Sequence, residues 1–391
     1  MSIRTHRRLQ RRIAGFGLVE ILVGVTIGLI TLLIVYQALA LSEGYRRSTT
    51  AGGDAQSSGM ISSFVLAGDI ANGGHTISES AGVLASCPNT GVFRTTWRPI
   101  PVLITDGGND WTSVSFGLFG GINRRRVSEL DLVTGYAPGG SFTVQSPLGF
   151  QRSHATEAPH LFVIANIAAV PPVCEVASIS PWPLAAGPLH WPTTSATFDD
   201  TTGMATITPV PAGAVTQNYP QGSSWVVNLG PNDRVRKVFY DVAGNVVRRT
   251  DLMAVVPVPN PVVSNIVLMQ AQYGIDTNND TFADTWVSAR NAPWRAADVL
   301  GAPIAQLRMV KAIRLAVVVR SAQFERPRDA EGRLLDNTTI NSDFTVTLFP
   351  CNGLPGCTGE MLNVTIPGTA NYRYRVYEQV IPLTNQIWNA S

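Results

Sequence analysis

A single carboxylate inside a long apolar stretch is the group in this sequence best placed to do chemistry. From Phe16 to Leu41 the chain reads FGLVEILVGVTIGLITLLIVYQALAL, and Glu20 is its only charged residue. An acid in the hydrocarbon core of a membrane costs about 2.5 to 3.5 kcal/mol, so its presence there indicates a function. The chemistry that Glu20 offers is the pairing of its negative charge with a cation.

The stretch around Glu20 is long enough to form a membrane-spanning helix, for which roughly 20 apolar residues suffice. A cluster of arginines precedes it: Arg4, Arg7, Arg8, Arg11 and Arg12. Positive charge marks the cytoplasmic side of a membrane segment. We therefore expect a single-pass protein with Met1 in the cytoplasm and the chain after Leu41 outside it.

Three interpretations of this segment compete. It could be a plain membrane anchor, or a cleaved secretory signal with Ala38-Leu39-Ala40 as a small-x-small cleavage site. Neither explains Glu20, unless the carboxylate only stabilises the N-terminal end of its own helix, where a negative charge is favoured by about 0.3 to 1 kcal/mol. The third interpretation explains Glu20 through the residues that precede it.

The start of the apolar stretch carries a processing signature. A basic leader and an apolar helix flank the sequence Gly15-Phe16-Gly17-Leu18-Val19-Glu20. This pattern resembles the prepilin signature of type IV pilins and type II secretion pseudopilins. The resemblance implies that a membrane peptidase cuts between Gly15 and Phe16 and methylates the new amine of Phe16.

The spacing of Phe16 and Glu20 suits a contact between subunits. The two residues are one helical turn apart, so the new amine and the carboxylate share a face. In a fibre of staggered parallel helices, Glu20 of one subunit could pair with the Phe16 amine of the next, with little water to weaken the attraction. Gly24 and Gly28 add a small-xxx-small face that permits close approach of another helix.

The rest of the chain divides into a helix and a large β-rich region. We expect a leader over 1–15, a membrane-spanning helix over 16–41, an amphipathic helix over 42–74 and a globular head over 75–391. The stripe that packs the amphipathic helix on the head is expected to comprise Ile61, Phe64, Val65 and Ile70.

The head has a composition typical of exported, turn-rich β proteins, since charged residues make up only 14% of the chain. A hairpin is predicted within 233–249, and strands over 310–321 and 371–383. The proline- and tryptophan-rich stretch 171–192 predicts an irregular excursion rather than a sheet. The expected fold class is α+β: a long N-terminal helix packed on a mainly antiparallel β-rich head.

Several stretches narrow the resemblance to the PilW-type minor pilins of type IV pili. They are FVLAGDIANGG, YGIDTNNDTFADTW, Trp294 with VKAIRLAVVVRS, and the closing YRYRVYEQVIPLTNQIWN. The family commonly has arginine after the aspartate-isoleucine pair, where this chain has Ala71. The resemblance implies a subunit that primes pilus assembly and lies at the tip, moving from the inner membrane, with its head in the periplasm, to the pilus.

The same resemblance implies the partners. They are the other minor pilins, the major pilin, the prepilin peptidase, the inner-membrane assembly machinery and a large adhesin at the pilus tip. No nucleic acid is expected, because the chain without its leader arginines carries more acids than bases. The chain is not expected to be an enzyme either, because it contains no HExxH motif, no P-loop and no GxSxG motif.

Two other functions stay open. A type II secretion pseudopilin shares the processed N-terminus but usually carries a smaller head. A membrane-anchored or secreted binding or adhesion protein would have Glu20 only by chance. The start of the mature chain separates these classes, because the last one needs no cut after Gly15.

Four cysteines suggest disulfides, since the head is expected outside the cytoplasm. Cys351 and Cys357 enclose only the loop NGLPG, which can bring their Cα atoms close enough for a bond. Cys87 would then pair with Cys174 by elimination.

The acidic loop DTNNDTFAD has oxygen ligands at the spacing of calcium loops: Asp276, Asn278, Asp280, the Phe282 carbonyl and Asp284. It lacks the glycine and the closing acid of an EF-hand, because Thr281 and Val287 occupy those positions. Aspartate and asparagine are also ordinary turn formers, so a solvated turn is expected, with calcium as the alternative and no cofactor required.

Overall fold

The protein is described here from a computed structural model. The residues that it describes are 17–74, 87, 90–93, 95–97, 100–108, 112–121, 129–146, 160–179, 196–199, 201–209, 215–231, 235–252, 254, 256–322, 343–351, 358–359, 361–366 and 372–384. The chain forms two compact units, Met1–Gly53 and Asp54–Ser391. The predicted processing residues Gly15 and Phe16 lie outside the described residues.

One unbroken helix, α1 (Leu18–Ala71), runs through the first unit and continues into the second. It contains no proline, and the pair Gly52-Gly53 does not interrupt it. The helix ends just before Gly73, whose N–H donates to the Ile70 carbonyl at 3.0 Å. Gly74 follows with a φ of 76°, the left-handed conformation that glycine adopts at helix ends.

The second unit contains a five-stranded sheet in the order β19-β16-β15-β17-β21. Its strands are β15 (Ile266–Ile275), β16 (Thr285–Ser288), β17 (Val310–Arg320), β19 (Thr358–Gly359) and β21 (Tyr374–Pro382). All pairs are antiparallel except β16 with β19. The strands predicted over 310–321 and 371–383 are confirmed as β17 and β21.

A second five-stranded sheet has the order β14-β13-β12-β4-β3. Its strands are β3 (Val102–Thr105), β4 (Ser115–Gly121), β12 (Val235–Ala243), β13 (Val246–Asp251) and β14 (Pro259–Ser264). The predicted hairpin is confirmed as β12 and β13, joined by Gly244 and Asn245. Both turn residues have positive φ, 59° and 61°, which is what a tight two-residue hairpin turn demands.

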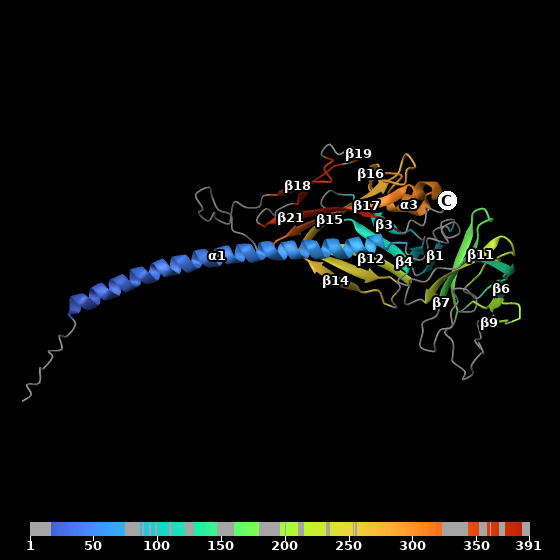
Figure 1. Ribbon diagram of the computed structural model, residues 1–391, viewed down its shortest axis with the longest axis horizontal. Coiled ribbons are helices and arrows are strands. Elements are labelled where there is room, and N and C mark those ends of the chain that lie inside the picture. The colour runs from blue at the N-terminus through green and yellow to red at the C-terminus, as the bar shows by residue number, and fades with distance from the viewer. Residues whose placement is uncertain are drawn as a thin grey trace, which may run out of the picture. The chain divides into compact units, whose positions relative to one another are not determined.

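A seven-stranded sheet follows the order β8-β7-β11-β5-β6-β10-β9. Its strands are β5 (Glu129–Thr134), β6 (Phe142–Val144), β7 (His160–Asn166), β8 (Val173–Ile179), β9 (Ala196–Phe198), β10 (Ala205–Ile207) and β11 (Ser224–Pro231). In Figure 1 its green strands, among them β7, β11 and β6, lie at one end of the second unit.

The predicted irregular excursion over 171–192 is wrong in its first part. Residues 173–179 form β8, which pairs antiparallel with β7 along its whole length. The prolines that suggested an excursion lie before and after this segment, so its own N–H groups remain available for the ladder. Residues 180–192 lie outside the described residues.

Smaller elements complete the described fold. Two-stranded sheets pair β1 (Thr90–Phe93) with β2 (Thr95–Trp97) and β18 (Phe344–Leu348) with β20 (Leu362–Ile366). Two short helices, α3 (Ala296–Gly301) and α4 (Ile304–Arg308), precede β17. The α+β fold class is confirmed: a long apolar N-terminal helix is followed by an antiparallel β-rich region.

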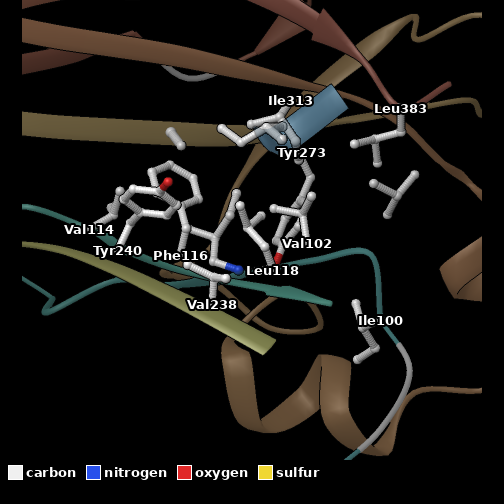
Figure 2. Packing of buried hydrophobic residues seen from close by; sticks show 14 of the residues in the cluster. Ile100, Val102, Val114, Phe116, Leu118, Val238, Tyr240, Tyr273, Ile313 and Leu383 are labelled. Carbon is white, nitrogen blue, oxygen red and sulfur yellow. Dashed lines mark hydrogen bonds between the residues drawn. The ribbon is translucent and has the colours of Figure 1, made fainter. Parts of the chain in front are cut away.

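The main core lies between the two five-stranded sheets. Figure 2 shows Phe116 and Tyr240 from one sheet with Tyr273 and Ile313 from the other, together with Leu383 after β21. The Tyr273 hydroxyl, fully buried, accepts a hydrogen bond from Ile104 N at 2.6 Å. Burial raises the pKa of Tyr273, so the tyrosine stays neutral and ties the sheets together.

The predicted packing stripe of the helix is partly wrong. Ile70 is fully buried, but Ile61 is 49% exposed and Phe64 is 83% exposed. The residues buried on the head are instead Ala55, Gly59, Ser62, Leu66 and Ile70. Three of these five are small, and small side chains let the helix axis lie close to the sheets. Hydrophobicity alone therefore selected the wrong face.

Candidate assembly surface

The N-terminal part of α1 is built to be surrounded by an apolar environment. Within the described residues, one segment, Leu18–Leu39, is long and apolar enough to cross a membrane, and none of it is buried in the protein. Its two threonine hydroxyls are satisfied inside the helix: Thr26 donates to the Val23 carbonyl at 2.9 Å and Thr31 to the Ile27 carbonyl at 2.8 Å. Glu20 is the only acidic or basic residue in this segment.

Glu20 occupies the first turn of α1. Its backbone N–H donates to the Gly17 carbonyl at 3.0 Å, and its side chain is exposed. Among the residues that the structure describes, no cation lies within salt-bridge distance of the Glu20 carboxylate. The Glu20 carboxylate is therefore available to a cation that the described residues do not supply.

Gly24 and Gly28 follow Glu20 at one-turn intervals. A Cβ placed on either glycine would meet no atom within 4 Å. The backbone of α1 is thus bare at two successive turns on one face, and another helix could approach it closely there.

Within the described residues, the second half of α1 is held to the head near its middle and near its end. Near its middle, the Tyr377 hydroxyl of β21 donates to the Gln56 carbonyl at 3.3 Å, and Gln379 Nε2 donates to the Ser63 carbonyl at 3.0 Å. The Tyr377 ring lies so close to Gly59 that any Cβ there would overlap it. The helix is therefore fixed against β21 by a side-chain ring that only glycine admits.

Near the end of the helix, Thr384 Oγ1 donates to the Ala71 carbonyl at 2.8 Å, and Asp69 forms a further attachment. Tyr240 of β12 donates a hydrogen bond to Asp69 Oδ2, and Arg249 Nε of β13 lies 3.7 Å from the same oxygen. Burial, followed by the hydrogen bond to Asp69, raises the pKa of Tyr240, so this hydroxyl remains a donor. Asp69 thus joins the end of the helix to the β12–β13 hairpin.

The exposed face of α1 between Ala55 and Gly68, opposite the residues buried on the head, is uncharged and partly apolar. From Ala55 to Gly68 the sequence contains no charged residue. Phe64 is 83% exposed and Met60 is 54% exposed, and a Cβ on Gly68 would meet nothing within 4 Å. A helix that faces only water normally carries charged side chains there, so this face has the character of a contact surface.

The predicted calcium loop is closed by its own hydrogen bonds. The Asp276 carboxylate accepts from the N–H groups of Asp280 at 3.2 Å and Thr281 at 2.8 Å. Asp280 accepts from Phe282 N at 2.8 Å, and Asp284 accepts from Thr277 N at 3.0 Å. Asn278 contributes an acceptor to Asp280 N at 3.1 Å. These hydrogen bonds define the turn.

Asp276 has a cationic neighbour. The buried Lys311 ammonium lies 3.9 Å from Asp276 Oδ2. The described residues contain no group of three or more His, Cys, Asp or Glu side chains that could hold a metal ion. The solvated turn and calcium binding both stay predictions.

A disulfide joins Cys87 to Cys174, the pairing expected by elimination. It ties the chain near β1 to β8 of the seven-stranded sheet. Cys351 is also disulfide-bonded. Its predicted partner, Cys357, lies outside the described residues.

The region that includes the helix attachments on β13 and β21 matches a known family. Residues 241–385 match the family model PilW, described as Type IV Pilus-assembly protein W. The predicted resemblance to PilW-type proteins is confirmed. The family is one of type IV pilus-assembly proteins. No curated protein and no solved structure matches the chain.

The PilW match begins at residue 241, far beyond the N-terminal signature. Gly15 and Phe16 therefore rest on sequence alone, whereas Glu20, Gly24 and Gly28 rest on sequence and local geometry. Sequence reasoning missed Gly59 and Asp69 as contact residues. Asp69 could have been noticed, because it is the only charged residue between Ala55 and Asn72. Gly59 had no such signal, because its role depends on a tyrosine more than 300 residues later.

Proposed function

We propose that this chain is a minor pilin that enters type IV pili, primes their assembly and lies at the pilus tip. The observation that carries the proposal is Glu20, an exposed carboxylate in the first turn of an apolar helix. A charge in that position is stable in hydrocarbon only with a partner of opposite sign. The processed amine of Phe16 on a neighbouring subunit is the partner that the N-terminal signature supplies.

Processing and assembly follow one another in this mechanism. Cleavage after Gly15 removes the leader arginines, which would resist passage through hydrocarbon, and exposes the Phe16 amine. Glu20 then pairs with the amine of an adjacent pilin, while Gly24 and Gly28 let the helices approach. The uncharged face around Phe64 packs on neighbouring subunits once the helix has left the membrane.

The size of the head supports a place at the tip. The second unit, Asp54–Ser391, is far larger than the first. A repeating subunit with so large a head would crowd a tightly packed fibre, whereas one copy at the tip would not. The proposed route begins in the inner membrane, with the N-terminus cytoplasmic and the head periplasmic. Its partners are the prepilin peptidase, the inner-membrane machinery, other minor pilins, the major pilin and a tip adhesin.

Mass spectrometry of the mature chain, combined with labelling of the head on intact pili, tests the proposal. The expected result is an N-methylated Phe16 at the start of the chain and label at pilus ends. Deletion of the gene should reduce the number of pili. A chain that keeps Met1, or that begins at Leu41, would contradict the proposal. A methylated chain that never enters pili would point to a secretion pseudopilin instead.

A further inference from the structure

Strand β21 forms a free edge of its sheet. Its register with β17 is regular throughout, and the bonds Ser321 N to Arg373 O and Leu383 N to Lys311 O lie at its two ends. Bonded and non-bonded positions alternate along an antiparallel pair, so the odd-numbered residues of β21 direct their N–H and C=O groups to β17. The even-numbered residues Val376, Glu378 and Val380 direct theirs away from the sheet.

Two other sheet edges in the described part of the chain are blocked. In β14, Pro259 and Pro261 occupy alternate positions and pair with Thr250 and Arg248 of β13. Proline has no N–H, so the outer edge of β14 offers no donor at either position. The opposite edge of the β21 sheet is β19, which is only two residues long. Both are common ways of preventing the addition of another strand.

The edge of β21 lacks these protections. The strand is nine residues long, has no register shift, and has no proline before Pro382. Within the described part of the chain, no backbone group bonds to the outward N–H of Val376, Glu378 or Val380. Three consecutive outward positions are therefore ready to pair with an extended segment.

An apolar surface borders this open edge. Tyr374 stacks on Phe344 of β18, with ring centroids 4.0 Å apart. These two rings, with Val376, Val346 and Ile366, are only half-buried around the small core between the β18–β20 sheet and the β21 sheet. A strand added beside β21 would cover part of this surface with every second side chain. On the opposite face of the sheet, the exposed Arg375 could form an ion pair with a carboxylate of the added strand.

We propose that the free edge of β21 accepts an extended segment of another pilus subunit as an added β-strand. The segment carries alternating apolar residues on the Val376 side and an acidic residue near Arg375. This inference rests on the proposed function, which supplies the partner. Because Tyr377 and Gln379 of the same strand bind α1, strand addition would act on the element that also holds the helix.

A pair of substitutions at one position tests the proposal in the full-length protein. Val380→Pro removes an outward N–H, and the strand already tolerates Pro382 at an equivalent outward position. Val380→Thr keeps the N–H and alters only a side chain that is 56% exposed. We expect the proline variant to fold in detergent but to be recovered in sheared pili about tenfold less than the threonine variant. Equal recovery of the two variants would overturn the proposal.

Hydrogen exchange of the unmodified chain gives a second measurement that does not depend on the variants folding. In purified pili, the amides of Val376, Glu378 and Val380 should exchange at least about tenfold more slowly than in the detergent-solubilised protein. Equal exchange in a chain that is present in pili overturns strand addition alone. Absence of the chain from pili overturns both the strand addition and the proposed function. A detergent-stable homodimer that Val380→Pro dissociates would overturn the choice of another subunit as partner.

Discussion

The ring of Tyr377 occupies the space that a side chain at Gly59 would need. The two residues belong to β21 and α1, and the Tyr377 hydroxyl also donates to the Gln56 carbonyl one turn earlier in the helix. Glycine in a helix interior normally costs about 0.5 to 1 kcal/mol relative to alanine. At position 59 that cost is offset by the close approach of the helix to the sheet.

Gly59→Ala should therefore lower the free energy of unfolding of the head by about 1 to 3 kcal/mol, because the methyl group must displace the Tyr377 ring. Gly68→Ala is the matched control, since its Cβ would meet nothing within 4 Å in the same helix. The control should raise stability by about 0.5 to 1 kcal/mol through helix propensity. Urea unfolding of the detergent-solubilised chain measures both. Equal stability of the two variants would show that Tyr377 does not constrain the helix.

The Gly59–Tyr377 contact is a feature that could not be predicted from the sequence. The apolar span, the end of the helix before Gly73 and the Gly244-Asn245 hairpin turn were predictable, because each depends on signals within a few residues. The face of the helix that packs on the head was not. Phe64 is more hydrophobic than Gly59, but the face is chosen by how closely helix and sheet can approach, which depends on β21 far along the chain.

The sheet orders were beyond prediction for a similar reason. β4 pairs with both β3 and β12, although more than 100 residues separate β4 from β12. The seven-stranded sheet places β8 at its edge, within a stretch whose prolines suggested no strand. Of the candidate site, Glu20, Gly24 and Gly28 are predictions from the sequence, while Asp69 was not predicted, because its partner Tyr240 comes from a distant hairpin.

Asp69 and Tyr240 should be coupled energetically. Tyr240→Phe removes the hydroxyl that donates to Asp69, and a buried hydrogen bond to a charged group contributes about 1.5 to 3 kcal/mol. In a double-mutant cycle with Asp69→Asn, the coupling energy should be about 1 to 2 kcal/mol, measured by urea unfolding. The combination of Asp69→Asn with Tyr377→Phe is the control, because Tyr377 contacts the helix elsewhere, and these two changes should be additive. Additivity of both pairs would contradict the role assigned to Asp69.

The Cys87–Cys174 disulfide should be a major stabilising element, because the bonded residues are separated by 87 positions. On the chain-entropy model, closing so long a loop stabilises the fold by about 4 to 5 kcal/mol. The double variant Cys87→Ser/Cys174→Ser should lose most of this free energy. Changing Cys351 and Cys357 to serine should cost only about 2 kcal/mol, since the predicted loop between them is short. Similar losses for both pairs would argue against the entropic explanation.

Lys237 should make the stability of the head rise with pH. Burial lowers the pKa of Lys237 from 10.5 to about 8. Between these values the unfolded chain holds a proton that the folded chain has released, so the unfolded state binds more protons and folding becomes more favourable as pH increases. Below about pH 8 the penalty for the half-buried charge is present in full.

Lys237→Met removes this titration. The variant should be more stable than the natural chain below pH 8, and the difference should shrink as pH approaches 10. Lys237→Arg keeps a charge across the whole range and should be less stable than the natural chain, increasingly so above pH 8. Thermal unfolding midpoints across the pH series measure all three proteins. Parallel curves for Lys237→Met and the natural chain would show that Lys237 does not carry the pH dependence.

A substitution at Glu20 distinguishes a role in pilus assembly from simple membrane anchoring. Glu20→Gln keeps the size of the side chain but removes its charge, so pairing with the Phe16 amine of a neighbour is lost while membrane insertion becomes easier. We expect normal amounts of the variant in the membrane and about tenfold less in sheared pili, measured by quantitative mass spectrometry. Glu43→Gln, a charge removal in the same helix beyond the apolar segment, should leave pilus content unchanged. If Glu20 only stabilised the N-terminal end of its own helix, its loss would cost at most about 1 kcal/mol, and pilus content would match that of the Glu43 variant.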